Sequence, residues 1–275
     1  MTNWPRRGRW RAFALCVVLC SAALAAPQSG GGQDTGSFYR ATAIVTGSDR
    51  RNRATGFARC FREVLVKVSG EPRLARNPRV DRLAAEANLF IGSFDYVDQM
   101  AGIKHKDDQG TYDRPFDLTV RFVPALIDKI LAGLGERPWR GERPVIVPAL
   151  TVRGFSTAYL LSTEGAAATD QRAAFAGVAR EYGMRVRFPT GAQLAEWGVT
   201  MGQFPSSQAA PSPDQVLVGG TLEFEKALPG WSGSWKMRYG GVDYAWGVRG
   251  VNFDEAFRDI VRGVVRVASG HGAPD

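Results

Sequence analysis

The chain has 275 residues and a formal net charge of +8, which is enough length for one large domain or two small ones. Half of that charge comes from Arg6, Arg7, Arg9 and Arg11 in residues 1–25, which hold no acid. Without that segment the charge falls to +4, an ordinary solvated surface that gives no argument for nucleic-acid binding.

Residues 1–25 are predicted to be a secretory signal peptide. The basic start is followed by an apolar run from Ala12 to Ala25 that is too short to span a membrane, and Ala23-Leu24-Ala25 forms a small-x-small cleavage site. We therefore expect a periplasmic protein with no transmembrane span in the mature chain. Export through the general or the twin-arginine route stays open. Residues 26–37 are predicted to be a flexible tether.

An N-terminal α/β domain is predicted over residues 38–134, around a helix at residues 57–70. The apolar residues of this helix recur with helical spacing, and Gly70 is placed to end it. Cys60 lies on the apolar face, so we expect a buried, inert thiol. The other expected elements are a strand at 38–46, a helix after Asn77-Pro78, strands near 92–100 and 116–122, and a helix from Pro124.

Residues 135–144 are predicted to be a linker, and residues 145–270 a C-terminal α/β domain. Its expected elements are strands at 145–152, 184–188 and 215–226, helices at 170–182 and after Thr190, loops at 154–168 and 203–214, a strand pair around Gly240-Gly241, and a helix after Asn252. The fold class is therefore α/β in the mixed α+β sense, with two small domains. The second domain ends in an antiparallel meander followed by a C-terminal helix.

Aromatic side chains alternate along the predicted strand pair, and the turn sets Trp235 opposite Trp246. Two interpretations stay open for this face. It is either a stacking platform for a sugar or peptide, or a core face beneath the final helix. The candidate binding residues are Trp231, Trp235, Tyr239, Tyr244 and Trp246.

Carboxylates offer the one route to hydrolysis that the sequence suggests. Glu223 and Glu225 lie two residues apart on one face of a predicted strand, and the alternative is a solvated strand face. Asp107, Asp108 and Asp113 could belong to a calcium loop; the alternative is that they form an exposed polar turn.

No other motif points to catalysis or to a cofactor. His105 and His271 have no partner that the local sequence supplies, so we expect neither a Ser-His-Asp arrangement nor a metal site. Phosphate-binding glycine motifs are absent, so no cofactor is expected. A run of arginines could form a patch for anionic lipid or a solvated helix face; these are Arg50, Arg51, Arg53, Arg59, Arg62, Arg73, Arg76, Arg79 and Arg82.

The block Val64-Leu65-Val66-Lys67-Val68-Ser69-Gly70, with Asn77-Pro78 and the segment from Arg143 to Val147, resembles the bacterial family called domain of unknown function 2066. That resemblance implies an uncharacterised exported protein and supplies no catalytic residues. The meander and final helix resemble the N-terminal domain of the TolB translocation protein. We therefore expect a non-enzymatic periplasmic binding or envelope-assembly protein with envelope proteins as partners; the alternative is an envelope hydrolase that uses carboxylates.

Overall fold

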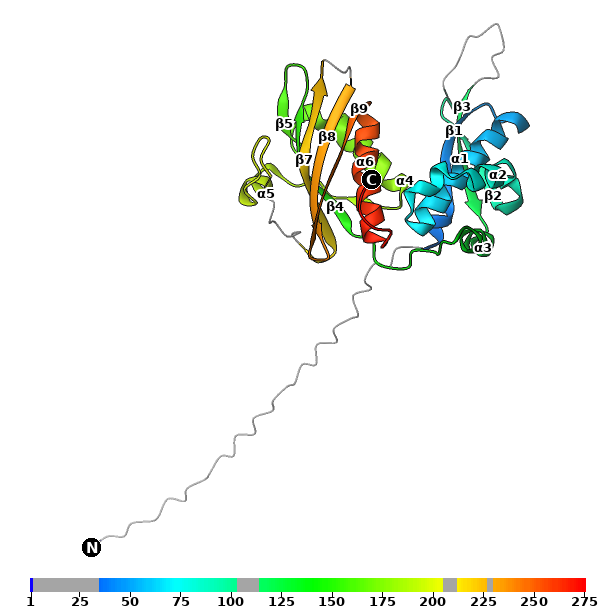
Figure 1. The fold of residues 1–275 in the computed structure, drawn as a ribbon, viewed down its shortest axis with the longest axis horizontal. Coiled ribbons are helices and arrows are strands. Elements are labelled where there is room, and N and C mark those ends of the chain that lie inside the picture. The colour runs from blue at the N-terminus through cyan, green and yellow to red at the C-terminus, as the bar shows by residue number, and fades with distance from the viewer. Residues whose placement is uncertain (2–34, 103–113, 205–211, 227–229) are drawn as a thin grey trace. The chain divides into compact units, whose positions relative to one another are not determined.

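A computed structural model describes Met1 and residues 35–102, 114–204, 212–226 and 230–275 (Figure 1). The predicted signal peptide beyond Met1, most of the predicted tether and the aspartates of the possible calcium loop lie outside these residues. Residues Asp34–Asp275 form one compact unit. Within the described ranges, no helix combines the length and the apolar character that crossing a membrane requires.

The first sheet is antiparallel and has the strand order β1-β3-β2. Its strands are β1 (Arg40–Thr46), β2 (Ile91–Asp98) and β3 (Pro115–Phe122). Residues of β1 alternate between buried and exposed, so one face of the sheet enters a hydrophobic core. Helices that follow or precede the strands are α1 (Arg50–Ser69), α2 (Pro78–Ala85), α3 (Pro124–Leu134) and the 3-10 helices η1 (Thr35–Tyr39), η2 (Pro72–Arg76) and η3 (Ala87–Phe90).

Helix α1 supplies the largest apolar stripe of this core. The stripe that the sequence predicts is buried along its length, at Phe57, Cys60, Phe61, Val64, Leu65 and Val68. The helix begins at Arg50 rather than at Phe57, because the side chain of Asp49 accepts hydrogen bonds from the N–H groups of Arg51 and Asn52. Its first turns carry few apolar residues, so periodicity alone does not reveal them.

The second sheet has six strands in the order β5-β4-β7-β8-β9, and β6 also pairs with β4. β4 runs parallel to β6 and β7, and β7, β8 and β9 form the predicted antiparallel meander. β5 lies in a segment that we expected to be a loop. The strands are β4 (Val145–Arg153), β5 (Ala158–Leu160), β6 (Arg185–Val186), β7 (Gln215–Glu225), β8 (Gly230–Tyr239) and β9 (Val242–Val251).

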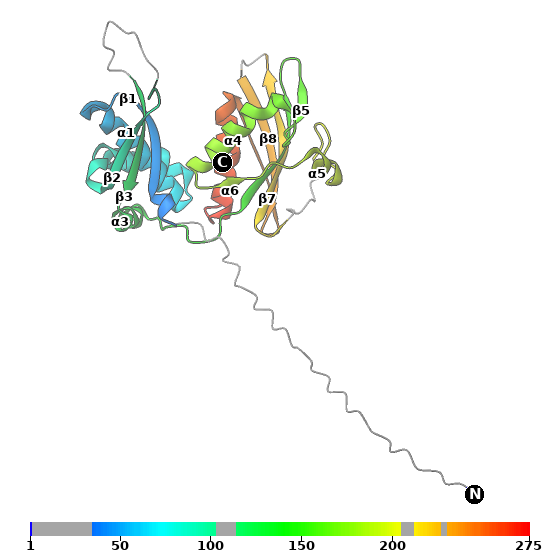
Figure 2. The ribbon, with the colours of Figure 1, turned by 180° about the vertical axis from the view of Figure 1, so that it is seen from behind.

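Helices α4 (Thr169–Glu181) and α6 (Phe253–Ala268) lie side by side on one face of this sheet (Figure 2). Their apolar residues share a core cluster with the inward side chains of β4, β7 and β8. Helix α5 (Gly191–Glu196) contributes to a smaller cluster with different residues of β4 and β7; the short 3-10 helix η4 (Ala166–Ala168) precedes α4. The predicted mixed α+β class, with its meander and C-terminal helix, is confirmed.

Each sheet has a core cluster of its own, and a buried arginine connects elements of the two parts. Arg143 donates to the carbonyl oxygens of Lys67 (2.7 Å) and Tyr182 (3.2 Å). Its guanidinium lies 4.0 Å from the ring centroid of Phe38 and 4.2 Å from that of Trp139. The guanidinium of Arg143 is therefore held by groups from both parts of the chain, residues before Arg143 and residues after it. The division into two domains at the expected boundaries stays a prediction.

Candidate functional site

The outer face of the second sheet, opposite α4 and α6, is covered over only part of its length. Under α5, Val147 and Leu217 form the small core cluster, and the ring of Phe204 lies so close to Gly219 that a Cβ atom there would clash with it. The strand period of two puts Thr221, Glu223 and Glu225 on the same face further along β7. Cover by apolar residues therefore ends where these polar residues begin.

Beyond that point the face is hollowed into an open groove of about 480 Å³, here called the sheet groove. Its lining comes from β7, β8 and β9 and consists of Thr221, Glu223, Glu225, Ser232, Gly233, Ser234, Gly247, Val248 and Arg249. Small residues, Ser232 and Ser234 of β8 and Gly247 of β9, lie between the glutamates and the arginine, so nothing bulky fills the space there. The sheet groove is therefore a consequence of small residues in register on neighbouring strands.

An irregularity of pairing places Arg249 at this site. Pairing shifts between Trp231 and Gly233 of β8, so that Ser232 alone stands opposite Arg249 and Gly250. Gly250 has a φ of +67°, which suits a residue without a side chain. Such bulges bend a strand and re-aim its side chains. The bulge thus brings a guanidinium to the groove that carries two carboxylates.

The polar side chains of the sheet groove have no partners among the described residues. Glu223, Glu225 and Arg249 make no side-chain hydrogen bond or ion pair there, and the buried hydroxyl of Ser232 likewise lacks a partner. Buried hydroxyl groups are nearly always hydrogen-bonded in folded proteins. A polar ligand or water molecules would satisfy them.

The aromatic residues proposed as a binding surface lie on the other face of the meander. Trp235 pairs with Trp246 as expected, but Trp235 is only 1% exposed, and its Nε1 donates to Asp259 of α6 at 2.9 Å. Trp246 donates to the backbone oxygen of Asp259, and its ring lies against Gly263. The partly buried rings of Trp231, Tyr239 and Tyr244 pack against the same cluster. These contacts match the core interpretation; a binding role for the five residues stays a prediction that their burial disfavours.

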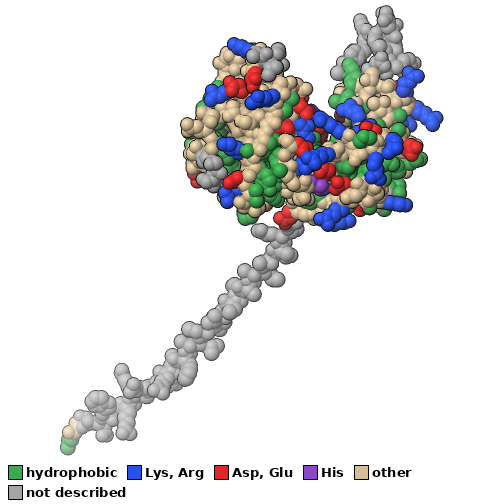
Figure 3. Space-filling model, in the orientation of Figure 1, with side chains coloured by type: hydrophobic (Ala, Val, Ile, Leu, Met, Phe, Trp, Pro, Cys, Tyr) green, Lys and Arg blue, Asp and Glu red, His purple; other side chains and the backbone are tan. Residues whose placement is uncertain are grey.

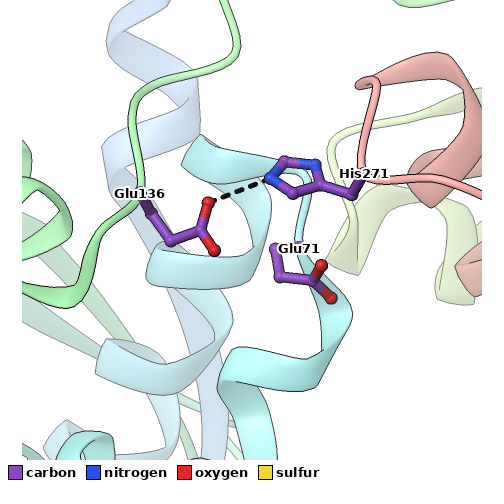
Figure 4. Close-up of side chains that lie close together, drawn as sticks. All are labelled: Glu71, Glu136 and His271. Atoms are coloured by element: carbon purple, nitrogen blue, oxygen red, sulfur yellow. Dashed lines mark hydrogen bonds and ion pairs between the residues drawn. The ribbon is translucent and has the colours of Figure 1, made fainter.

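A second cluster of polar side chains joins the end of α6 to the first part of the chain. Arg266 is 4% exposed, and its Nη1 donates to both carboxylate oxygens of Glu71, at 2.7 and 2.8 Å. Burial makes such a pair costly to break from one side. His271 contacts Ser269 and Glu136, as Figure 4 shows for Glu136. We call Glu71, Glu136, Arg266, Ser269 and His271 the C-terminal latch.

The C-terminal latch contains the atoms that a metal ion could use. One ligand atom each from Glu71, Glu136 and His271 lies within 4.8 Å of the others. However, the guanidinium of Arg266 already occupies both oxygens of Glu71. A metal ion bound to the same carboxylate would lie beside a fixed positive charge, so the donor set does not fit a cation while that ion pair stands.

His271 also corrects the expectation that neither histidine has a partner. Its Nδ1 lies 2.7 Å from Ser269 Oγ and its Nε2 lies 2.9 Å from Glu136 Oε2, a chain of contacts like that of a hydrolase triad. Ser269 Oγ, however, also lies within hydrogen-bond distance of the carbonyl oxygens of Gly70 and Arg266. Carbonyl oxygens at a helix C-terminus disfavour a developing oxyanion. The chain of contacts therefore fits a latch better than a nucleophile.

Comparison with known families gives a match over the first part of the chain. Residues 33–140 match the model of a domain of unknown function, DUF8605. The expected domain of unknown function 2066 was therefore wrong, although the coarser expectation of an uncharacterised domain is confirmed. The residues that suggested it, from Val64 to Gly70, are core and cap positions of α1, where packing limits the choice of residue in unrelated chains. No curated protein and no solved structure matches the chain, so the resemblance to TolB stays a prediction.

Proposed function

We propose that this chain is a non-enzymatic binding protein of the bacterial cell envelope, and that the sheet groove holds a small zwitterionic ligand of the amino-acid or short-peptide class. One observation carries the proposal. The carboxylates of Glu223 and Glu225, the guanidinium of Arg249 and the buried hydroxyl of Ser232 meet in one groove, and none has a partner among the described residues.

The charges of the groove define the ligand. An ammonium group complements Glu223 and Glu225, whereas a carboxylate complements Arg249, whose planar guanidinium forms paired hydrogen bonds. A hydroxyl such as that of Ser232 can accept a hydrogen bond from the ammonium or donate one to the carboxylate. A ligand with both charges can therefore contact the glutamates and the arginine at once. The volume of about 480 Å³ is in the range of small-molecule pockets.

The envelope location rests on the sequence. A basic start, an apolar run and a small-x-small site at Ala23-Leu24-Ala25 support export to the periplasm. A binding protein in that compartment meets small polar solutes and the proteins of the envelope. Cys60, the one cysteine of the described residues, is buried and forms no disulfide there.

A carboxylate hydrolase is the second candidate, because Glu223 and Glu225 line the same groove. Residues two apart on a strand have Cα atoms about 7 Å apart, which is within reach of a two-carboxylate mechanism. Such enzymes, however, flank the scissile bond with their two carboxyl groups. Two glutamates on one strand approach a ligand from one side, so their arrangement favours binding over cleavage.

Thermal-shift screening with a dipeptide library, followed by calorimetry on the best ligand, tests the proposal. Arg249→Gln should weaken that ligand by about 10–100-fold, the effect of losing a hydrogen bond to a charged group. Lys236→Gln is the matched control. Lys236 is exposed on the same face of the sheet as Arg249 but does not line the groove. Equal affinity of the Arg249 variant and wild type would contradict the proposal. Cleaved ligand in the mass spectrum, absent with Glu223→Gln, would favour the hydrolase.

A further inference from the structure

A smaller pocket of about 290 Å³ opens between the start of α1 and the end of α2. Its walls are apolar and its mouth is basic. The lining residues are Arg50, Arg53, Ala54, Phe57, Ala84, Ala85, Ala87 and Asn88. Alanine provides half of the lining residues, which leaves a small space at the low end of the size range of ligand pockets. It has room for a small charged group but not for a whole lipid.

Arg53 is held in place at the mouth of this pocket. Its Nε donates to Tyr96 Oη at 3.1 Å and its Nη2 donates to the carbonyl oxygen of Ser48 at 3.3 Å. Its guanidinium lies 4.9 Å from the ring centroid of Phe94. Nη1 has no hydrogen-bond partner among the described residues. Arg53 therefore offers a preoriented donor group, and Arg50 adds a second, exposed guanidinium without a partner.

Arg50, Arg51 and Arg53 lie together at this end of α1, whereas two arginines elsewhere in the predicted basic patch are paired with carboxylates and two more are held by backbone oxygens. Arg62 pairs with Asp81, Arg73 with Asp275, Arg59 donates to a backbone oxygen, and so does Arg79. Arg50 and Arg51 have none in the described part of the chain, and Asp49 beside them is engaged in capping the helix. Basic side chains are prominent on the surface around α1 and α2 in Figure 3.

Exposed apolar side chains stand beside the same pocket. Leu89 follows Asn88 of the lining and is 62% exposed, and Phe94 packs on Phe57 of the wall yet remains 39% exposed. Basic groups next to exposed apolar groups are the pattern of a surface that lies on an anionic membrane. The arginines can meet phosphate groups, while Leu89 and Phe94 enter the layer beneath them.

We propose that the start of α1, η3 and Phe94 of β2 form a docking site for an anionic phospholipid surface, with the lipid phosphate held by Arg50 and Arg53 and the apolar contact made by Leu89 and Phe94. An acidic peptide would use the arginines but would not require Leu89. The proposal is independent of the sheet groove, which belongs to other strands and other charges.

Co-sedimentation with vesicles that contain phosphatidylglycerol tests this site, and vesicles of phosphatidylcholine alone are the reference. Arg50→Glu reverses one exposed charge, and a carboxylate in the first turn of a helix supports the helix. The fold should therefore persist while the partition coefficient falls about 30-fold, which is about 2 kcal/mol for two charge units near the surface. Leu89→Ser should lower it by about 10-fold through lost apolar contact.

Arg76→Glu is the matched control. Arg76 is an exposed arginine without a side-chain partner in the described residues, and it follows the opposite end of α1. It should partition like wild type; all proteins share residues 1–33, so any contribution from that segment cancels. Equal losses for Arg50→Glu and Arg76→Glu would overturn the proposal. So would equal binding to both vesicle types, or an unchanged partition of Leu89→Ser, which would point to an acidic peptide.

Discussion

Replacing Trp235 separates the two interpretations of the aromatic hairpin. The side chain is 1% exposed and lies between the meander and α6. Truncation of a buried aromatic residue leaves a cavity, so Trp235→Ala should lower the free energy of unfolding by about 3–5 kcal/mol. For a compact unit of this size, each kcal/mol lowers the melting temperature by about 2–4 °C. The expected drop is therefore about 10 °C.

Trp235→Phe isolates the hydrogen bond from the packing. Phenylalanine keeps most of the apolar volume but loses the 2.9 Å bond from Nε1 to Asp259. A hydrogen bond to a charged group contributes about 1.5–3 kcal/mol, and Asp259 keeps a contact with Arg262 at 3.4 Å. We therefore expect a loss near the lower end of that range, about 1.5–2 kcal/mol.

The pH dependence of this variant follows from Asp259. Burial raises the pKa of this carboxyl, and the hydrogen bond from Trp235 acts in the opposite direction. A raised folded-state pKa means that the contribution of Asp259 to stability is fully present below its unfolded pKa and is lost as the pH rises through the folded pKa. Without the Trp235 donor the folded pKa rises further. The penalty of Trp235→Phe should therefore be smaller near pH 4 than at pH 7.

Urea denaturation followed by circular dichroism measures the free-energy losses of Trp235→Ala and Trp235→Phe and the pH dependence of the second. The comparison requires that the slope of the unfolding free energy with denaturant stays constant across the variants. Trp231→Phe, at a partly buried ring of the same strand, is the matched control for loss of an indole. If Trp235→Ala unfolds like wild type, the reasoning about α6 fails. The aromatic face would then be free for a ligand.

Two further predictions concern buried groups. Burial raises the pKa of the Cys60 thiol to about 12, so native protein should react slowly with a thiol reagent. The contribution of Cys60 to stability should be full below about pH 8.5 and decline toward pH 12, a decline that Cys60→Ala removes in alkaline unfolding curves. Arg266→Met should lower the free energy of unfolding by about 3–5 kcal/mol, because it leaves Glu71 buried and unpaired. The double variant Arg266→Met with Glu71→Leu should lose less. Equal losses of the two variants in urea denaturation would refute the latch ion pair.

Local patterns of the sequence predict the elements whose signals are also local. Asn252 precedes an apolar stripe, and its side chain accepts a hydrogen bond from Glu255 N–H at the start of α6, as an N-cap residue does. Gly240 and Gly241 both adopt positive φ angles, which fixes the hairpin and therefore sets Trp235 opposite Trp246. In contrast, β5 has three residues, too few for a period to be visible.

The candidate site could be predicted only in part. The strand period puts Glu223 and Glu225 on one face, which the sequence shows directly. The hollow beside them depends on Ser232 and on Gly247, which reach this place through pairing with two other strands. A glycine inside an apolar strand, Gly250, is the signal that could have indicated the bulge and hence Arg249.

The C-terminal latch shows why polar contacts between distant residues cannot be predicted from local sequence patterns. Arg266 lies on the final helix, where its spacing suggests a solvated position, and Glu71 follows the glycine that ends α1. The two are 195 residues apart, and His271 and Glu136 are 135 apart. Glu71 and Arg266 are buried as a pair of opposite charges, and periodicity contains no information about which residue a buried charge will meet. An apolar stripe indicates that a face is covered by something apolar, whereas a buried charge requires polar or charged groups at one particular place, which here come from elsewhere in the chain.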